Sequence, residues 1–385
     1  MSTSAEETKN VFLQKETGDH PDQPETVGLP SRYSLFLWQH WMQDILDFQE
    51  FFYYATVAKR KKPNWSSPNK IVNDLNCFSI RKFSGEQTEQ TPTLILPPFA
   101  GHYSTIADYA RGQSLVRHLS DFGVDNIYSL DYKSATQEMK FYDIDQYLME
   151  LNIAVDDLGD HVNLIGLCQG GWFAAIFAAR FPQKVNSLVL AGSPIDTKAC
   201  SGFLDKIVEQ APDRFWHNIV AAGGGLMDGK LMLNGFKSMN PTQHYWQKYL
   251  DLYQGVKSKR NDGSYLERYE NFEVWYENTL KLPGRWYKQV IKELFKENKF
   301  IKGEFKALGK IAHPQNITCP TYLLGGEKDD ITLPEQVFDA DLYFGTPKEH
   351  IEKGLAKAGH IGLFMGRKVL ANNWKNIADW LLKYN

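Results

Sequence analysis

A single cysteine stands at a point in the sequence where a chain can present a nucleophile. Cys168 lies between Gly166 and Gly170, directly after the apolar run HVNLIG and before the helix-forming run WFAAIFAARFP. A strand, a tight turn and a helix in this order expose one side chain at a sharp bend, where larger residues than glycine would collide with neighbouring elements. The alternative is a buried cysteine in an ordinary turn, since free cysteine is often buried. We predict that Cys168 is a nucleophile and that the backbone N–H of Gln169 stabilises an oxyanion.

Two later loops contain the acid and the base that such a thiol needs. The segment YLLGGEKDDITLP predicts a strand followed by an acidic loop, in which Asp329 is the preferred acid and Asp330 the alternative. The segment LAKAGHIGLFMG places His360 between glycines, although a surface-loop histidine would fit there too. Nucleophile, acid and histidine in this chain order are typical of the α/β-hydrolase fold. His360 would then act as general base for Cys168, and Asp329 would fix the tautomer of the imidazole.

The loop PPFAGHY, after the apolar run TLIL, is the expected source of a second oxyanion donor. The backbone N–H of Phe99 or of Ala100 is predicted to fill this role. His102 follows directly, and it either lines the substrate pocket or forms a local hydrogen bond within its loop. Neither alternative for His102 is favoured by the sequence.

The elements around these motifs predict an α/β-hydrolase fold with a mainly parallel sheet and an inserted helical cap. The expected strands are Asn76–Phe83, Thr93–Pro97, Asn126–Leu130, Val162–Ile165, Ser187–Ala191, Thr321–Leu324 and His350–Lys353. The expected organisation is a disordered tail (1–30), an aromatic amphipathic helix (31–62), a first part of the core (65–196), a helical cap rich in Trp and Tyr (197–315) and a second part of the core (316–385). The tail is polar and rich in Glu, Thr, Ser, Asp and Pro, which is typical of disorder.

The composition excludes several classes of protein. The net charge of −3 does not favour a nucleic-acid partner. The four cysteines contain no CxxC pair and no metal-ligand spacing with histidine, so we expect free thiols, a reducing compartment, no metal and no cofactor. The N-terminus has no apolar signal-peptide core and the chain has no apolar run long enough for a transmembrane segment. A cytoplasmic protein is therefore expected.

Longer stretches resemble two related families. VNLIGLCQGGWFAAIFAARFPQKV, NITCPTYLLGGEKDD and AGHIGLFMG resemble the polyhydroxyalkanoate synthases, whose nucleophile is a cysteine in a lipase-like box. PPFAGHYSTIADYARGQSLV, LAGSPIDTKA and GFKSMNPTQHYWQKYLDLYQG are more similar to the intracellular polyhydroxybutyrate depolymerases, which also use a cysteine. The resemblance covers residues 65–382 and implies Cys168 as nucleophile, Asp329 as acid and His360 as base.

The resemblance leaves the direction of the reaction open. An intracellular polyhydroxybutyrate depolymerase-like esterase or thioesterase is the leading interpretation. A synthase that polymerises 3-hydroxyacyl-coenzyme A and a non-catalytic granule-binding protein are the alternatives. A thiol nucleophile forms a thioester that exchanges readily with coenzyme A, which is thus a possible co-substrate. The expected partners are a polyhydroxyalkanoate or its 3-hydroxyacyl thioesters, and the aromatic helix 31–62 could contact a polymer granule, unless its aromatic residues pack against the core.

Overall fold

The computed structural model describes residues 32–83, 89–258 and 264–385, so the expected disordered tail 1–30 lies outside the described residues. The chain forms two compact units, Met1–Phe48 and Gln49–Asn385. Helix α1 (Arg32–Phe52) crosses from the first unit into the second and continues as a π-helical turn and a 3-10 turn up to Arg60. No helix in the described ranges has the length and apolar character needed to cross a membrane.

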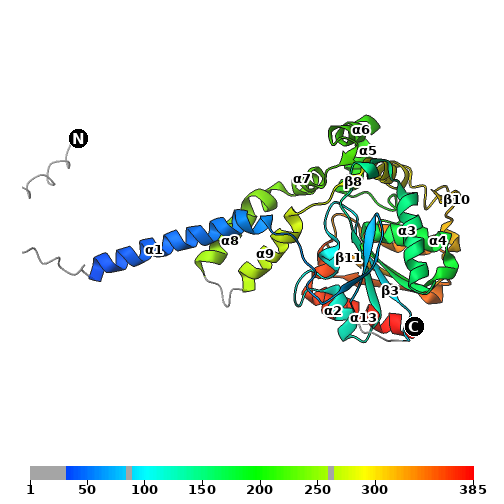
Figure 1. The fold of residues 1–385 in the computed structure, drawn as a ribbon, viewed down its shortest axis with the longest axis horizontal. Coiled ribbons are helices and arrows are strands. Elements are labelled where there is room, and N and C mark those ends of the chain that lie inside the picture. Colours follow the sequence, from blue (N-terminus) through cyan, green and yellow to red (C-terminus); the bar gives the residue numbers. More distant parts are fainter. Residues whose placement is uncertain (1–31, 84–88, 259–263) are drawn as a thin grey trace, which may run out of the picture. The chain divides into compact units, whose positions relative to one another are not determined.

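An eight-stranded sheet forms the centre of the larger unit (Figure 1). Its strands are β1 (Lys70–Asp74), β2 (Phe78–Lys82), β3 (Thr93–Leu96), β4 (Ile127–Tyr132), β5 (Val162–Leu167), β6 (Val185–Ala191), β11 (Thr321–Gly326) and β12 (Ile351–Ala356). They lie in the order β1-β2-β4-β3-β5-β6-β11-β12. The pairs β1–β2 and β2–β4 are antiparallel, whereas all pairs from β4 to β12 are parallel. The predicted α/β-hydrolase fold with a mainly parallel sheet is confirmed.

Each predicted strand overlaps a strand of this sheet, and β1 is the strand that the sequence did not indicate. Its two large apolar side chains, Ile71 and Val72, are adjacent in the chain and both exposed. A half-buried strand is recognised by alternation of apolar and polar residues, and β1 lies at the edge of the sheet without that alternation.

Helices cover both faces of the sheet, which explains why strands β3, β5 and β11 are buried along their whole length (Figure 1). One face packs against α3 (Ile144–Asp157), α4 (Gln169–Arg180) and α11 (Pro334–Phe338). The other face packs against α2 (Leu115–Asp121), α12 (Gly362–Met365) and α13 (Arg367–Lys383). A parallel sheet buried in this way consists of near-continuous apolar runs, such as TLIL and VNLIGL.

The segment between β6 and β11 is mainly helical and lies where a helical cap is predicted. Its helices are α5 (Phe203–Gln210), α6 (Asp213–Ala222), α7 (Gly229–Met239), α8 (Lys248–Lys257), α9 (Ser264–Glu277) and α10 (Gly284–Gln289). Two short antiparallel strand pairs accompany them: β7 (Leu226–Met227) with β8 (Leu282–Pro283), and β9 (Lys306–Ala307) with β10 (Lys310–Ile311). Two turns of this segment, Gln243–Gln247 and Val290–Lys296, are π-helical, and Pro314–Asn316 is a 3-10 turn.

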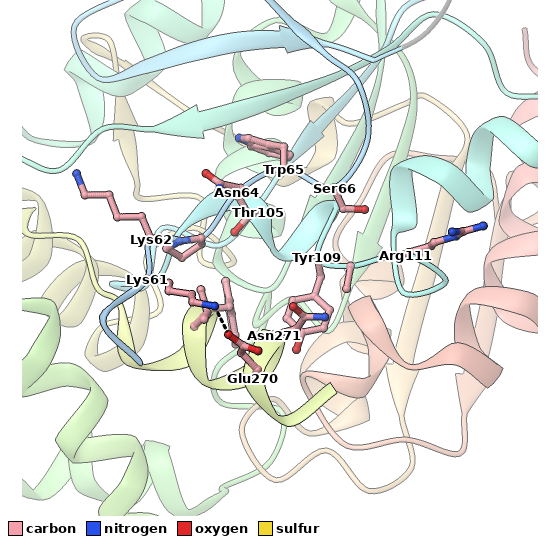
Figure 2. A pocket seen from close by; sticks show the side chains of 14 residues that line it. Lys61, Lys62, Asn64, Trp65, Ser66, Thr105, Tyr109, Arg111, Glu270 and Asn271 are labelled. Atoms are coloured by element: carbon pink, nitrogen blue, oxygen red, sulfur yellow. Dashed lines mark hydrogen bonds and ion pairs between the residues drawn. The ribbon is translucent and has the colours of Figure 1, made fainter. Parts of the chain in front are cut away.

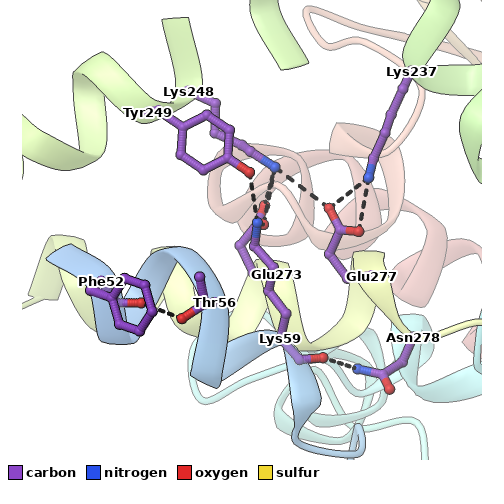
Figure 3. A network of polar contacts seen from close by, with 9 residues as sticks. All are labelled: Phe52, Thr56, Lys59, Lys237, Lys248, Tyr249, Glu273, Glu277 and Asn278. Atoms are coloured by element: carbon purple, nitrogen blue, oxygen red, sulfur yellow. Dashed lines mark hydrogen bonds and ion pairs between the residues drawn. The ribbon is translucent and has the colours of Figure 1, made fainter. Parts of the chain in front are cut away.

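Buried charges hold three of these helices together (Figure 3). The carboxylate of Glu273 in α9 is fully buried and lies 3.0 Å from the Lys248 ammonium and 3.4 Å from that of Lys59. One turn later, Glu277 accepts a hydrogen bond of 2.7 Å from Lys237 in α7. Removing one member of a buried ion pair leaves an uncompensated charge, which is strongly destabilising. The network therefore fixes the position of α9, which also contributes Trp275 and Tyr276 to the site described next.

Candidate active site

Cys168 occupies a strained turn between β5 and α4. Its backbone has φ 50° and ψ −119°, a conformation that is uncommon for any residue other than glycine, and its N–H donates to the Ala191 carbonyl at 2.9 Å. A Cβ atom on Gly170 would lie 1.9 Å from the Leu96 carbonyl oxygen, and one on Gly166 would lie 2.4 Å from a Cα atom of the next helix. The predicted reason for both glycines, close approach of strand and helix, is thus present in the structure.

The next glycine in the motif has a separate reason to be small. A Cβ atom on Gly171 would lie 1.8 Å from the hydroxyl oxygen of Ser193, which follows β6. Ser193 is buried, and its hydroxyl donates to the carbonyl of Gly166 at 3.3 Å and to that of Ala191 at 3.2 Å. The start of α4 is therefore packed directly against the loop after β6.

The structure brings His360 and Asp329 together and leaves Asp330 outside. The Nδ1 atom of His360 lies 2.8 Å from the Oδ2 atom of Asp329, and both side chains are buried. The second carboxylate oxygen of Asp329 accepts hydrogen bonds from the backbone N–H groups of Ile331 (3.0 Å) and Thr332 (2.9 Å). The Asp329 carboxylate is therefore held in one orientation, with one oxygen on the imidazole, whereas Asp330 is exposed.

His360 and Cys168 line one cavity of about 100 Å³. Burial is the largest influence on the imidazole of His360 and would lower its pKa, but the Cys168 sulfur and the Asp329 carboxylate together raise the pKa to about 10. Both neighbours thus favour the protonated form of the imidazole. A protonated imidazole next to a cysteine favours the thiolate, which is the nucleophilic form of the side chain.

The expected oxyanion donors are placed around the same turn. Within residues 32–83, 89–258 and 264–385, the backbone N–H groups of Gln169, Phe99 and Ala100 have no hydrogen-bond acceptor. The absence of a partner is normal for Gln169 because it is the first residue of α4. The ring of Phe99 is held by Tyr132 (4.6 Å between centroids) and Trp286 (5.0 Å), which fixes its loop. Whether Phe99 or Ala100 is the second donor stays a prediction.

His102 lines the catalytic cavity, which is the first of the two alternatives, and its hydrogen bond goes to α9 and not to its own loop as the second alternative expected. Its Nε2 atom lies 3.1 Å from the carbonyl oxygen of Tyr276 in α9, and its ring stacks on Trp275 at 4.7 Å. Burial lowers the pKa of His102 to about 4. The side chain is therefore neutral at neutral pH and acts as a wall of the cavity, in contrast to His360.

Sequence reasoning missed the side chains that the inserted segment contributes to this cavity. Leu204, Phe236, Trp275, Tyr276 and Phe295 all line it. The many aromatic residues of RYENFEVWYENTL indicated that this helix contacts other apolar groups, but the sequence did not show which face of the helix meets the core. No group of His, Cys, Asp and Glu in the described parts of the chain is arranged to hold a metal ion.

A second, apolar cavity of about 290 Å³ adjoins the catalytic one, and we call it the apolar chamber. The two cavities share Gln169, Leu204, Phe236 and Phe295 as lining residues. The apolar chamber lies among α5, α6, α7 and α10 and is lined almost entirely by aliphatic and aromatic side chains. The apolar chamber therefore borders the cavity that contains Cys168.

The environments of the four thiols predict which one reacts first. Burial and Glu335 raise the pKa of Cys200 to about 11, burial raises that of Cys319 to about 12, and burial with Glu150 raises that of Cys77 further. We expect iodoacetamide at neutral pH to modify Cys168 first, because its sulfur faces the protonated imidazole. Peptide mass spectrometry after short exposures measures the order. Faster modification of Cys200 would contradict the assignment of Cys168 as nucleophile.

The elbow, the acid and the histidine lie at the carboxyl ends of β5, β11 and β12, as in an α/β-hydrolase. The chain belongs to the family described as "Protein of unknown function (DUF3141)", which it matches over residues 84–382. It is 25% identical over 323 residues to "Poly(3-hydroxyalkanoate) polymerase subunit PhaC" of Haloferax mediterranei, covering 82% of this chain and 63% of that protein, less than two thirds of its length.

Further relatives have the same description. The PhaC subunit of Synechocystis sp. is 28% identical over 287 residues (72% of this chain, 74% of that protein), and that of Thiocystis violacea is 25% identical over 325 residues (82% and 88%). Of the two resemblances found in the motifs, these relatives support the one to polyhydroxyalkanoate synthases. Solved structures similar to this chain include the Paleococcus ferrophilus monoacylglycerol lipase (15% identity, 80% of this chain and 99% of that one, TM-score 0.48) and carboxylesterase CesB from Bacillus subtilis (13%, 89% and 99%, 0.45).

Proposed function

We propose that this chain is an acyltransferase that forms a thioester on Cys168 and adds 3-hydroxyacyl groups to a growing polyhydroxyalkanoate. The observation that carries the proposal is a thiol at the elbow, next to a buried imidazole whose other nitrogen is held by Asp329. The relatives named as polymerases support this direction over the depolymerase that the sequence motifs placed first.

The proposed reaction has two steps. In the first, the Cys168 sulfur attacks the carbonyl carbon of a 3-hydroxyacyl thioester, and the departing thiol takes the proton from His360. In the second, the hydroxyl group at the end of a chain attacks the acyl-cysteine, His360 accepts its proton, and the sulfur leaves as the new ester forms. The N–H of Gln169 and that of Phe99 or Ala100 would stabilise the oxyanion in both steps.

A thiol suits this sequence of steps better than a hydroxyl. Exchange of an acyl group between two thiols costs little free energy, because one thioester replaces another. Transfer from a thioester to an alcohol is downhill, which drives ester formation. An acyl-serine would instead lie below the thioester donor and would resist the return exchange.

The apolar chamber supports an acyl group larger than the catalytic cavity could hold alone. Its wall is almost entirely aliphatic and aromatic, which suits the hydrocarbon part of a 3-hydroxyacyl group.

If the apolar chamber holds the acyl group, filling the chamber should change the preference for the length of the acyl chain. Gly235 in α7 lines it, and a Cβ atom there would have no heavy atom within 4 Å. Gly235→Leu should therefore fold well, since leucine is favoured over glycine in a helix. We expect kcat/KM for 3-hydroxydodecanoyl thioesters to fall about tenfold or more, and that for 3-hydroxybutyryl thioesters to change little.

A substitution at the preceding residue, Asn234→Leu, is the matched control, because Asn234 is exposed like Gly235 but does not line the chamber. It should alter neither value. An equal loss of kcat/KM for the long and the short donor in Gly235→Leu would show that the chamber does not hold the acyl chain.

Purified protein should be incubated with 3-hydroxybutyryl-coenzyme A and, separately, with amorphous polymer granules. Release of free coenzyme A together with polymer growth is the expected result, and Cys168→Ala should abolish it. Soluble monomer from the granules would instead establish the depolymerase. Sedimentation with granules without turnover would establish a binding protein.

A further inference from the structure

A third cavity, of about 710 Å³ (Figure 2), shares the lining residue Trp275 with the catalytic cavity. Trp275 lines both cavities, and its indole N–H donates to the Tyr103 carbonyl at 3.0 Å, which holds this shared side chain in place. Thr105 lines the third cavity and the next residue, Ile106, lines the catalytic one. The third cavity, called the cationic pocket below, is open to solvent and is not used by the proposed mechanism.

The charges around the cationic pocket are mainly positive. Its charged lining residues are Lys61, Lys62, Arg111 and Glu270. Lys61 pairs with Glu270, and this hydrogen bond raises the pKa of Lys61. Across the described ranges, neither Lys62 nor Arg111 has a carboxylate partner. Two cations are thus available for an anionic ligand.

The rest of the lining favours a ligand with a ring and polar atoms. Trp65 is held in place by Phe83 (5.1 Å between centroids) and by Asp131, which accepts a hydrogen bond of 3.3 Å from its indole N–H. An aromatic ring and two cations that have no carboxylate partner in the described ranges are features that bind a nucleotide.

We propose that the cationic pocket binds the phosphate-bearing nucleotide end of the acyl thioester donor. This inference rests on the proposed function, because the donor must reach Cys168 with its other end. The catalytic cavity then lies between a polar, cationic pocket on one side and the apolar chamber on the other. A donor with an anionic nucleotide at one end and an apolar acyl group at the other matches this order of environments.

The test compares two donors that carry the same acyl group. 3-Hydroxybutyryl-coenzyme A has the nucleotide and its phosphates, whereas the N-acetylcysteamine thioester has neither. Lys62→Ala and Arg111→Ala should each raise KM about tenfold for the coenzyme A thioester, the usual effect of losing one charge-assisted hydrogen bond. KM for the N-acetylcysteamine thioester should not change. Lys206→Ala, at an exposed lysine of α5, is the control and should affect neither donor.

Equal changes for both donors, or none for either, would overturn the inference. Calorimetry with the Cys168→Ala protein tests the pocket without turnover. Coenzyme A and adenosine diphosphate should bind, and Lys62→Ala with Arg111→Ala should weaken both. Binding of inorganic phosphate as tight as that of coenzyme A would overturn the nucleotide assignment in favour of a free-anion site. If the proposed function is wrong, neither donor turns over, and calorimetry still reports whether the pocket binds a nucleotide.

Discussion

Replacing Cys168 by serine is expected to leave the fold intact and to reduce turnover by about a thousandfold or more. The change in size is small, and the backbone N–H of residue 168 keeps its bond to the Ala191 carbonyl. We therefore expect the free energy of unfolding to change by about 1 kcal/mol or less. Thermal unfolding of both proteins measures this part of the prediction.

The loss of turnover follows from the acidity of the two groups. A serine hydroxyl does not ionise next to the imidazole of His360, so its proton must be removed during the attack itself. The acyl-serine would also exchange poorly with coenzyme A. Mass spectrometry after exposure to a 3-hydroxybutyryl thioester should find either a persistent adduct on the serine or no adduct. Turnover close to that of the original protein would show that an ordinary esterase mechanism suffices and that the thiol is no sign of thioester chemistry.

Replacing Asp329 by asparagine should lower kcat by about 10³ to 10⁴-fold. The carboxylate raises the pKa of His360 and accepts the hydrogen bond from its Nδ1 atom. An amide cannot supply the counter-charge and would favour the wrong tautomer of the imidazole. Steady-state kinetics measure the loss, and thermal unfolding shows whether the loop is retained, since Asp329 also binds two backbone N–H groups.

Asp330→Asn is the matched control, because Asp330 is the next residue and its side chain is exposed. It should keep most of the activity. If Asp330→Asn were the more damaging substitution of the two, the acid would be Asp330, and the position of Asp329 in this structure would not be its position during the reaction.

Local sequence patterns predicted the centre of the fold because the elements there are built from neighbouring residues. The run VNLIGL is buried throughout, and the glycines on either side of Cys168 mark a tight turn, so both can be recognised in one short window. The histidine loop and the acidic loop were found in the same way. Their contact, the bond between His360 and Asp329, could be expected only from their order in the chain.

The parts of the fold and of the site that the sequence did not predict depend on contacts between distant segments. Glu273 is a charged residue in a helix, and nothing near it in the sequence indicates that it is buried against Lys59 and Lys248. Trp275 similarly belongs to a run of aromatic residues. Only the tertiary structure shows that it is the one of them that lines two cavities. The cationic pocket is invisible in the sequence because its lining comes from three separate segments.

The packing of Gly171 against Ser193 changes what the CQGG motif can be used for. This double glycine, Gly170 and Gly171, lies in the stretch VNLIGLCQGGWFAAIFAARFPQKV that resembles the polyhydroxyalkanoate synthases. A Cβ atom at residue 171 would lie 1.8 Å from the Ser193 hydroxyl oxygen. The glycine is therefore required by the packing of α4 against Ser193, which follows β6. Its presence therefore records how closely α4 approaches that loop and carries no information on whether ester bonds are made or broken. If members of this family were assigned to polymer synthesis or to hydrolysis by this motif alone, the assignment would reflect only how closely α4 packs against the loop after β6.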